Sequence, residues 1–352
     1  MTRASSNDLD YLTTRLHARR SRMAEGERLE ELCRLRTGPE LGRAVLPGLE
    51  ISGIADFQRH LVRHLAQEIF ACLKHLETDE QEFIAWLLAR YQIENAKILL
   101  RGCLNRLPLE TLQPYLILSP ASLGLDATAL LAAKGVAEFA RLLPPGAPSI
   151  RLQALLASQR EPPPFLLEAA LDAGYFHELL ARNNRLPGGE LEIVKPVVFQ
   201  EINWFQFMLV TRGRFHFGLT ADNLMPMGML GGGELGEWFN GLLSAPDLAA
   251  AAKESVGVVL DDLPAGQRAN GDPAAAEVSA IESLAWHRFL RLANSAFRRS
   301  HNGVGAVAGY FGVRRMEIAN LITLSEGIRL GVTERDIRER MIPRMGREVA
   351  HV

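Results

Sequence analysis

Three short segments of the chain resemble one another and lie at nearly equal spacing, and this repetition constrains the fold more than any other feature. In each segment a run of apolar helix-forming residues ends near a glycine. The three glycines are Gly102, Gly213 and Gly327, which are separated by 111 and 114 residues. A fixed internal period indicates a repeat architecture. We therefore predict three helical repeats, at residues 1–118, 119–235 and 236–352.

Each glycine is followed by the same two kinds of residue. A proline or threonine comes first, at the same distance in the first and third segments and one position later in the second, and then a leucine or isoleucine. The residues are Pro108 and Leu112, Thr220 and Leu224, and Thr333 and Ile337. Proline and threonine suit the first positions of a helix. We expect a helix to end at each glycine in a left-handed cap, as at Gly327, and a new helix to follow.

The parts of the repeats that precede these helices agree only in two of the three units. Glu168, six intervening residues and Tyr175 in the second unit parallel Glu282, six residues and Phe289 in the third. The sequence shows no such match in the first unit.

The apolar residues follow a helical period throughout the chain. Residues 57–76, 83–101 and 165–181 place large apolar side chains one turn apart. Only residues 193–199 resemble a strand, and Pro196 weakens that interpretation. We predict an all-α protein.

Composition excludes several classes of protein. The 352 residues are 47% hydrophobic, which supplies enough apolar material for a folded core. A net charge of −2 argues against nucleic acid as a partner. Three scattered cysteines, Cys33, Cys72 and Cys103, fit a reducing compartment. No apolar stretch is long enough to cross a bilayer and no signal core is present, so we expect no direct membrane insertion. Arginine supplies 34 of the 39 basic residues, which favours a bacterial source.

Two patterns could carry chemistry. His60 and His64 are spaced i,i+4, as zinc ligands on one helix face can be, but neither a third ligand nor the glutamate of a zinc protease motif is evident. The stretch from Gly228 to Gly236 is rich in glycine but lacks the Lys-Ser/Thr ending of a phosphate-binding loop. We interpret the histidines as part of a solvated basic face and the glycine-rich stretch as a connector.

The polar residues near the first glycine favour a structural interpretation. Asn95 falls on or beside the apolar helix face, where its amide must find hydrogen-bond partners. Glu94 and Arg101 share a face with Lys97 between them. We predict a polar clamp between helices rather than a catalytic or docking role.

A family resemblance rests on these residues. The run from Tyr310 to Leu321, continued by Gly327 to Ile337, resembles the C-terminal signature of the C subunit of V-type/A-type ATPases, the counterpart of the eukaryotic d subunit. The pattern there is a tyrosine, then Glu-x-x-Asn-Leu, a glycine and an acidic helix. Residues 91–102 are similar to the first such helix of that family, and residues 11–19 to its N-terminal helix. The matching residues are Tyr91, Asn95, Lys97, Arg101, Gly102, Arg212, Gly213, Glu317, Asn320 and Gly327.

The resemblance implies a non-catalytic protein without a cofactor or metal. Three related helical units would form a funnel about a pseudo-threefold axis. It would sit on the cytoplasmic face of the membrane, on the proteolipid ring, and receive the central rotor shaft, so that ATP hydrolysis or synthesis is coupled to ion transport. The chain departs from the family at Ala319 and Ile322, where the family often has arginine, and the asparagine of the second copy is displaced. These losses put any partner contact of those basic residues in doubt.

Two other classes of function remain open from the residues alone. One is a helical protein-interaction scaffold, although a period of about 110 residues far exceeds the roughly 34–47 residues of common helical solenoids. The other is a metal-dependent hydrolase that uses His60 and His64.

Overall fold

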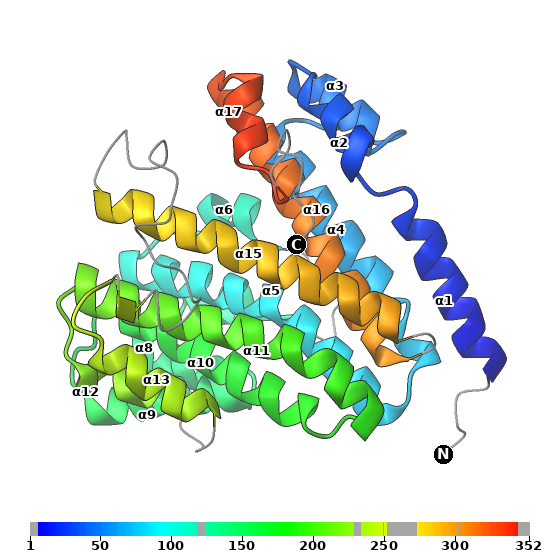
Figure 1. Cartoon of the computed structure of the whole chain (residues 1–352). Coiled ribbons are helices and arrows are strands. Elements are labelled where there is room, and N and C mark those ends of the chain that lie inside the picture. The colour runs from blue at the N-terminus through cyan, green and yellow to red at the C-terminus, as the bar shows by residue number, and fades with distance from the viewer. Residues whose placement is uncertain are drawn as a thin grey trace.

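The computed structural model describes residues 6–117, 124–228, 234–248, 250–251, 273–300 and 303–343. Within these ranges every regular element is a helix, which confirms the all-α class (Figure 1). Residues 193–199, the only stretch with strand-like character, lie inside helix α11, and Pro196 is in that helix's interior. Their buried side chains Val194, Val197 and Val198 are spaced as one face of a helix requires.

The helices follow one another in the order of the three expected units. The first unit holds α1 (Ser6–Arg20), α2 (Gly26–Cys33), α3 (Gly38–Val45), α4 (Ile54–Phe70), α5 (Thr78–Asn105) and α6 (Leu109–Leu112), with 3-10 turns η1 (Leu73–His75) and η2 (Gln113–Tyr115). The second holds α7 (Ala127–Leu131), α8 (Val136–Leu142), α9 (Ala147–Ser158), α10 (Pro164–Asn183), α11 (Gly188–Val210), a π turn η4 (Thr211–His216), α12 (Ala221–Leu224) and a 3-10 turn η5 (Met225–Met227). The remainder is α13 (Glu234–Ser244), α15 (Pro273–Arg299), α16 (Val304–Leu330) and α17 (Glu334–Glu339).

Six long helices contact one another in a closed order. Helix α4 packs on α5, α5 on α10, α10 on α11, α11 on α15, α15 on α16, and α16 on α4. Figure 1 shows α5, α11 and α15 crossing the molecule in similar directions, with α16 and α4 together at one side. Contacts within a unit, such as α4 with α5, therefore alternate around the ring with contacts between units, such as α5 with α10.

The repeat glycines have a different role from the predicted one. Gly327 lies inside α16, and the left-handed residue that follows this helix is Gly331, with φ of 67°. The corresponding residues with positive φ in the other units are Arg106 and Gly218. The expectation that Gly327 is a left-handed cap is therefore wrong, because the helix continues past it for most of another turn.

What the three glycines share is close packing. A Cβ atom at Gly102 would lie 2.3 Å from Cδ1 of Leu112. A Cβ at Gly213 would lie 2.6 Å from Leu224, and one at Gly327 would lie 2.6 Å from Ile337. Each glycine thus makes room for the apolar side chain of the short helix that follows, and this contact keeps the short helix against the long one.

The second unit contains one extra residue in its connector, and the structure shows where it is accommodated. The chain after α11 forms a π turn, in which the N–H of Phe217 donates to the carbonyl of Arg212, five residues earlier. A π turn takes up one residue more than an α turn. This accounts for the longer separation of Gly213 from Thr220 than of the glycine from its proline or threonine in the other units.

The short helices begin at the residues that the repeat supplies. Thr220 is the N-cap of α12 and forms a capping box with Asn223. Thr333 is the N-cap of α17, where its hydroxyl accepts a hydrogen bond from the N–H of Asp336.

The structure does not describe one of the two expected unit boundaries, at 118/119. Most of the glycine-rich stretch, residues 229–233, also lies outside the described residues. The other boundary, at 235/236, falls within α13. The three unit ranges stay predictions.

Candidate functional site

Three charged residues from equivalent places in the repeats meet where the long helices approach one another. Arg90, Glu201 and Arg315 lie on α5, α11 and α16, each at the same sequence distance before the glycine of its unit. Nη1 of Arg90 is 3.6 Å from Oε1 of Glu201, and Nη1 of Arg315 donates to the same oxygen. The carboxylate of Glu201 thus joins α5, α11 and α16, and the two guanidinium groups leave this charged cluster with a net positive charge.

The arginines of this cluster are held by more than the carboxylate. The guanidinium of Arg315 lies between two aromatic rings, 5.3 Å from the ring centre of Phe289 and 5.5 Å from that of Phe311. Burial would lower the pKa of Arg90, but Glu201 together with the more distant Glu94 and Asp172 outweighs it, and the pKa is raised. Removing the single carboxylate would leave two partly buried cations facing each other, so Glu201 is indispensable to this packing.

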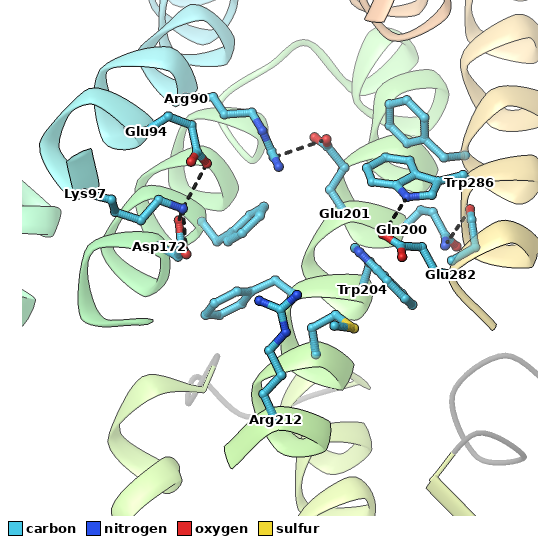
Figure 2. Close-up of a pocket in the computed structure, with 15 residues that line it drawn as sticks. Arg90, Glu94, Lys97, Asp172, Gln200, Glu201, Trp204, Arg212, Glu282 and Trp286 are labelled. Carbon is cyan, nitrogen blue, oxygen red and sulfur yellow. Dashed lines mark hydrogen bonds and ion pairs between the residues drawn. The ribbon is translucent and has the colours of Figure 1, made fainter. Parts of the chain in front are cut away.

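A pocket of about 210 Å³ opens beside the charged cluster, among α5, α10, α11 and α15 (Figure 2). Arg90 and Glu201 form part of its lining. Its apolar wall consists of Phe176, Trp204, Phe205, Met208, Trp286 and Phe289. Of the sequence-predicted site residues, Lys97 and Arg212 line this pocket, and the other eight do not.

Lys97 is paired in the pocket. Its Nζ lies 3.0 and 3.2 Å from the two carboxylate oxygens of Asp172 and 2.9 Å from Oε1 of Glu94. Burial would lower the pKa of Lys97, but these two carboxylates outweigh it and raise that pKa. Lys97 is therefore charged at physiological pH and joins α5 to α10 through an ion pair between units.

The residues one position before each glycine, Arg101, Arg212 and Glu326, lie where the helices of neighbouring predicted units meet. Arg101 forms a two-pronged ion pair with Glu168 of α10, at 2.5 Å for each hydrogen bond. Glu326 accepts a 2.8 Å hydrogen bond from Gln58 of α4. The corresponding residues at the interface of the second and third units are Arg212 and Glu282, and no ion pair joins these two described residues.

These contacts identify the missing counterpart in the first unit. Gln58 is followed seven residues later by the buried Leu65, just as Glu168 is followed by Tyr175 and Glu282 by Phe289. The sequence pattern of a glutamate and an aromatic residue is indeed absent from the first unit, but the contacts supply a structural counterpart. In that counterpart a glutamine and a leucine stand where the other two units have a glutamate and an aromatic residue.

Two asparagines hold the chain that follows the short helices. The amide of Asn95 donates to the carbonyl of Ile117 at 2.7 Å, and its oxygen accepts from the Ile117 N–H at 2.8 Å. Asn320 makes the same pair of bonds with Ile342, at 2.8 and 2.9 Å. Both partners lie 22 residues further along the chain. The equivalent residue of the second unit is Gln206, whose buried amide has no hydrogen-bond partner among the described residues.

Glu317 lies in a separate network between α16 and the N-terminal part of the chain. One carboxylate oxygen accepts a 2.6 Å hydrogen bond from the N–H of Ala24, and the other pairs with Arg314. Burial raises the pKa of Glu317, and Arg314 partly opposes this effect. Arg314 and Tyr310 also contact Glu68 of α4, at 3.3 and 3.0 Å. The network fastens α4 and the segment that precedes α2 to α16.

Tyr91 lies beside the cluster of Arg90, Glu201 and Arg315, and His64 lies beside Glu68 and Arg314. Tyr91 is partly buried against the core, and burial raises the pKa of its hydroxyl. The rings of His60 and His64 have centres 6.3 Å apart, and Nε2 of His60 is 3.7 Å from Asp56. In the described part of the chain, no group of three or more His, Cys, Asp or Glu side chains could hold a metal ion.

The described part of the chain is all-α, and its six long helices contact one another in a closed order. A family model described as the C/AC39 subunit of ATP synthase matches residues 12–340. The chain therefore belongs to the V/A-type ATP synthase C/AC39 subunit family, which is an accessory rather than a catalytic component of the ATPase. A comparison with curated proteins finds no match. Among the described residues, no helix has both the length and the apolar character to cross a bilayer.

Sequence reasoning missed the residues at the centre of this site. Arg90, Glu201 and Arg315 carry different charges and share no motif, so similarity between the repeats does not reveal them. Counting back by an equal number of positions from each repeat glycine would have aligned the three. Two arginines and one glutamate at these aligned positions are the signal that could have predicted an ion-pair contact among them.

Proposed function

We propose that this chain is the non-catalytic central-stalk adaptor of a V/A-type ATPase. It sits on the proteolipid ring at the cytoplasmic face of a bacterial membrane, receives the end of the rotor shaft, and couples ATP hydrolysis or synthesis to ion transport. The observation that carries this proposal is the family match over residues 12–340, which spans nearly the whole chain.

The contacts between units support a role in passing torque. A torque adaptor must resist shear between its parts, and the six long helices contact one another in a closed order with no free end. Polar contacts cross the unit interfaces at Arg101–Glu168, Lys97–Asp172 and Gln58–Glu326. In this proposal the three helix pairs surround a pseudo-threefold axis near Glu201, where Arg90 and Arg315 meet its carboxylate.

The experiment is a pull-down from detergent-solubilised membranes. The tagged chain is expressed in its own host, captured, and its partners are identified by mass spectrometry, with an untagged strain as the control. Recovery of both proteolipid and rotor-shaft subunits is the expected result. Recovery of neither would contradict the adaptor and favour a general helical scaffold.

A further inference from the structure

Two arginine-rich segments that are far apart in the sequence lie next to each other in the fold. Residues 11–24, which cover most of α1 and the turn after it, contain four arginines and no acidic residue. Residues 283–300, which cover the C-terminal part of α15, also contain four arginines and no acidic residue. Because the net charge of the whole chain is only −2, these two segments concentrate positive charge in one region.

Side-chain contacts hold the two segments together. Nη2 of Arg20 on α1 donates to Oδ1 of Asn294 on α15 at 2.5 Å. The guanidinium of Arg20 lies 5.0 Å from the ring centre of Phe297, and the ring of His17 lies 4.7 Å from the same phenylalanine. The two segments are therefore parts of one surface rather than separate patches.

The helical period places the arginines of α15 on its outer side. Arg291 and Arg298 are seven residues apart and share a helix face, and Arg288 lies one turn before Arg291. Arg20 is partly neutralised by Glu25, at 3.8 Å. Five other arginines of the two segments are exposed, and none of them forms an ion pair with a described residue. We call these five residues the arginine face: Arg22, Arg288, Arg291, Arg298 and Arg299.

The form of the arginine face favours an extended anionic surface over a small ligand. Arg288 and Arg299 are eleven residues apart on one helix, which corresponds to about 16 Å. None of the five arginines lines the pocket beside Glu201. Two large apolar side chains next to the arginines are also exposed, Leu284 by 38% on α15 and Tyr11 by 56% on α1. Exposed apolar side chains among arginines are typical of protein surfaces that lie at the level of lipid headgroups.

We propose that the arginine face binds the anionic headgroups of the membrane surface. The guanidinium groups donate hydrogen bonds to lipid phosphate oxygens, and Leu284 packs at the headgroup level beside them. The choice of a membrane rather than an acidic protein rests on the proposed function, which seats the chain at a membrane. The inference adds a contact with the lipid itself to the contacts with other subunits, and it assigns that contact to α1 and α15.

The test is sedimentation of the purified chain with lipid vesicles. One set of vesicles is phosphatidylcholine alone, and the other is equal parts of phosphatidylcholine and the anionic phosphatidylglycerol. The chain should bind the anionic vesicles only, and added salt should weaken this binding.

Two pairs of substitutions test whether the location of the charge matters. Arg291→Gln/Arg298→Gln should weaken binding to anionic vesicles at least tenfold. Arg335→Gln/Arg340→Gln removes the same charge from two exposed arginines at α17, and this matched control should change binding less than twofold. Circular dichroism of both variants checks that the helices remain folded.

Three results would overturn the lipid contact. They are absence of binding to anionic vesicles, equal binding to both kinds of vesicle, and equal weakening by the two pairs of substitutions. Tighter binding to a polyglutamate peptide than to the anionic vesicles would also overturn it, in favour of an acidic protein partner. The vesicles contain no ATPase subunit, so their failure to bind leaves the proposed function intact. Recovery of no ATPase subunit in the pull-down would contradict the proposed function alone.

Discussion

The end of α11 differs from the ends of α5 and α16, although all three follow the same packing rule. At each end a glycine accommodates Leu112, Leu224 or Ile337. At the first and third ends an asparagine then fixes the backbone 22 residues further on. At the second end the equivalent Gln206 is buried without a partner among the described residues, and the helix runs into a π turn.

This difference shows which part of the repeat is needed for folding and which part can change. The glycine contact is purely steric and tolerates an inserted residue, since the π turn absorbs it. The amide clamp, meaning the two hydrogen bonds between an asparagine side chain and the backbone 22 residues further on, requires a fixed distance along the chain. In the unit with the insertion, the described residues do not form this pair of bonds. The same unit carries Arg212, which lacks the pairing that Arg101 and Glu326 have at the other two interfaces. Departures from a repeated structural rule are expected where a surface serves a partner.

The largest expected effect comes from removing a clamp. Asn320→Leu leaves both the N–H and the carbonyl of Ile342 without their partner, which should lower the free energy of unfolding by about 2 kcal/mol. Asn95→Leu should cost a similar amount at Ile117. Urea denaturation followed by circular dichroism measures both values. A loss below about 0.5 kcal/mol at both sites, smaller than one ordinary hydrogen bond contributes, would show that the clamps do not stabilise the repeat ends.

Overpacking the glycine contact should have the next largest effect. Gly327→Val forces its side chain onto Cδ1 of Ile337 and should cost about 1–2 kcal/mol. The second substitution Ile337→Val removes that methyl group and should restore part of the loss. If the double variant is less stable than Gly327→Val alone, a steric contact with Ile337 is not the reason for the glycine. Gly331→Ala, at the true left-handed residue, should cost about 1 kcal/mol without such rescue.

Gln206→Leu should act in the opposite direction to the asparagine variants. The substitution replaces a buried amide that has no partner among the described residues with an apolar side chain of similar size, so the free energy of unfolding should rise or stay within about 0.5 kcal/mol. The same urea titration compares it with Asn320→Leu. A loss as large as that of the asparagine variant would mean that the second end has a clamp of its own.

The smallest effect concerns pH at the interface of α4 with α16. Burial lowers the pKa of His64, although Glu68 opposes this shift. Below the ordinary histidine pKa of about 6.5 the unfolded chain binds a proton that the folded chain resists, so stability falls as the pH decreases through this range. His64→Gln should reduce that dependence in urea midpoints measured on either side of this pKa. An equal dependence in the variant would exclude His64 as its source.

Much of the architecture could be predicted from the sequence. The helical period predicted the all-α class, and the glycine spacing marked three places where a long helix nears its end and a short helix follows. The function of the glycines could not be predicted, because Gly327 and Gly331 are both plausible helix-ending residues and only the backbone shows which has positive φ. The contact of Arg90, Glu201 and Arg315 depends on packing between distant segments. Periodicity within one helix carries no information about such packing.

The central claim is that this chain transmits rotation without carrying out chemistry itself. The most direct measurement uses the ATPase reconstituted in liposomes with and without the chain, and follows ATP hydrolysis and ATP-driven ion uptake together. Without the chain, we expect hydrolysis by the catalytic part to continue while ion uptake is lost, and addition of the purified chain should restore uptake. Ion uptake at full rate in its absence would contradict the claim.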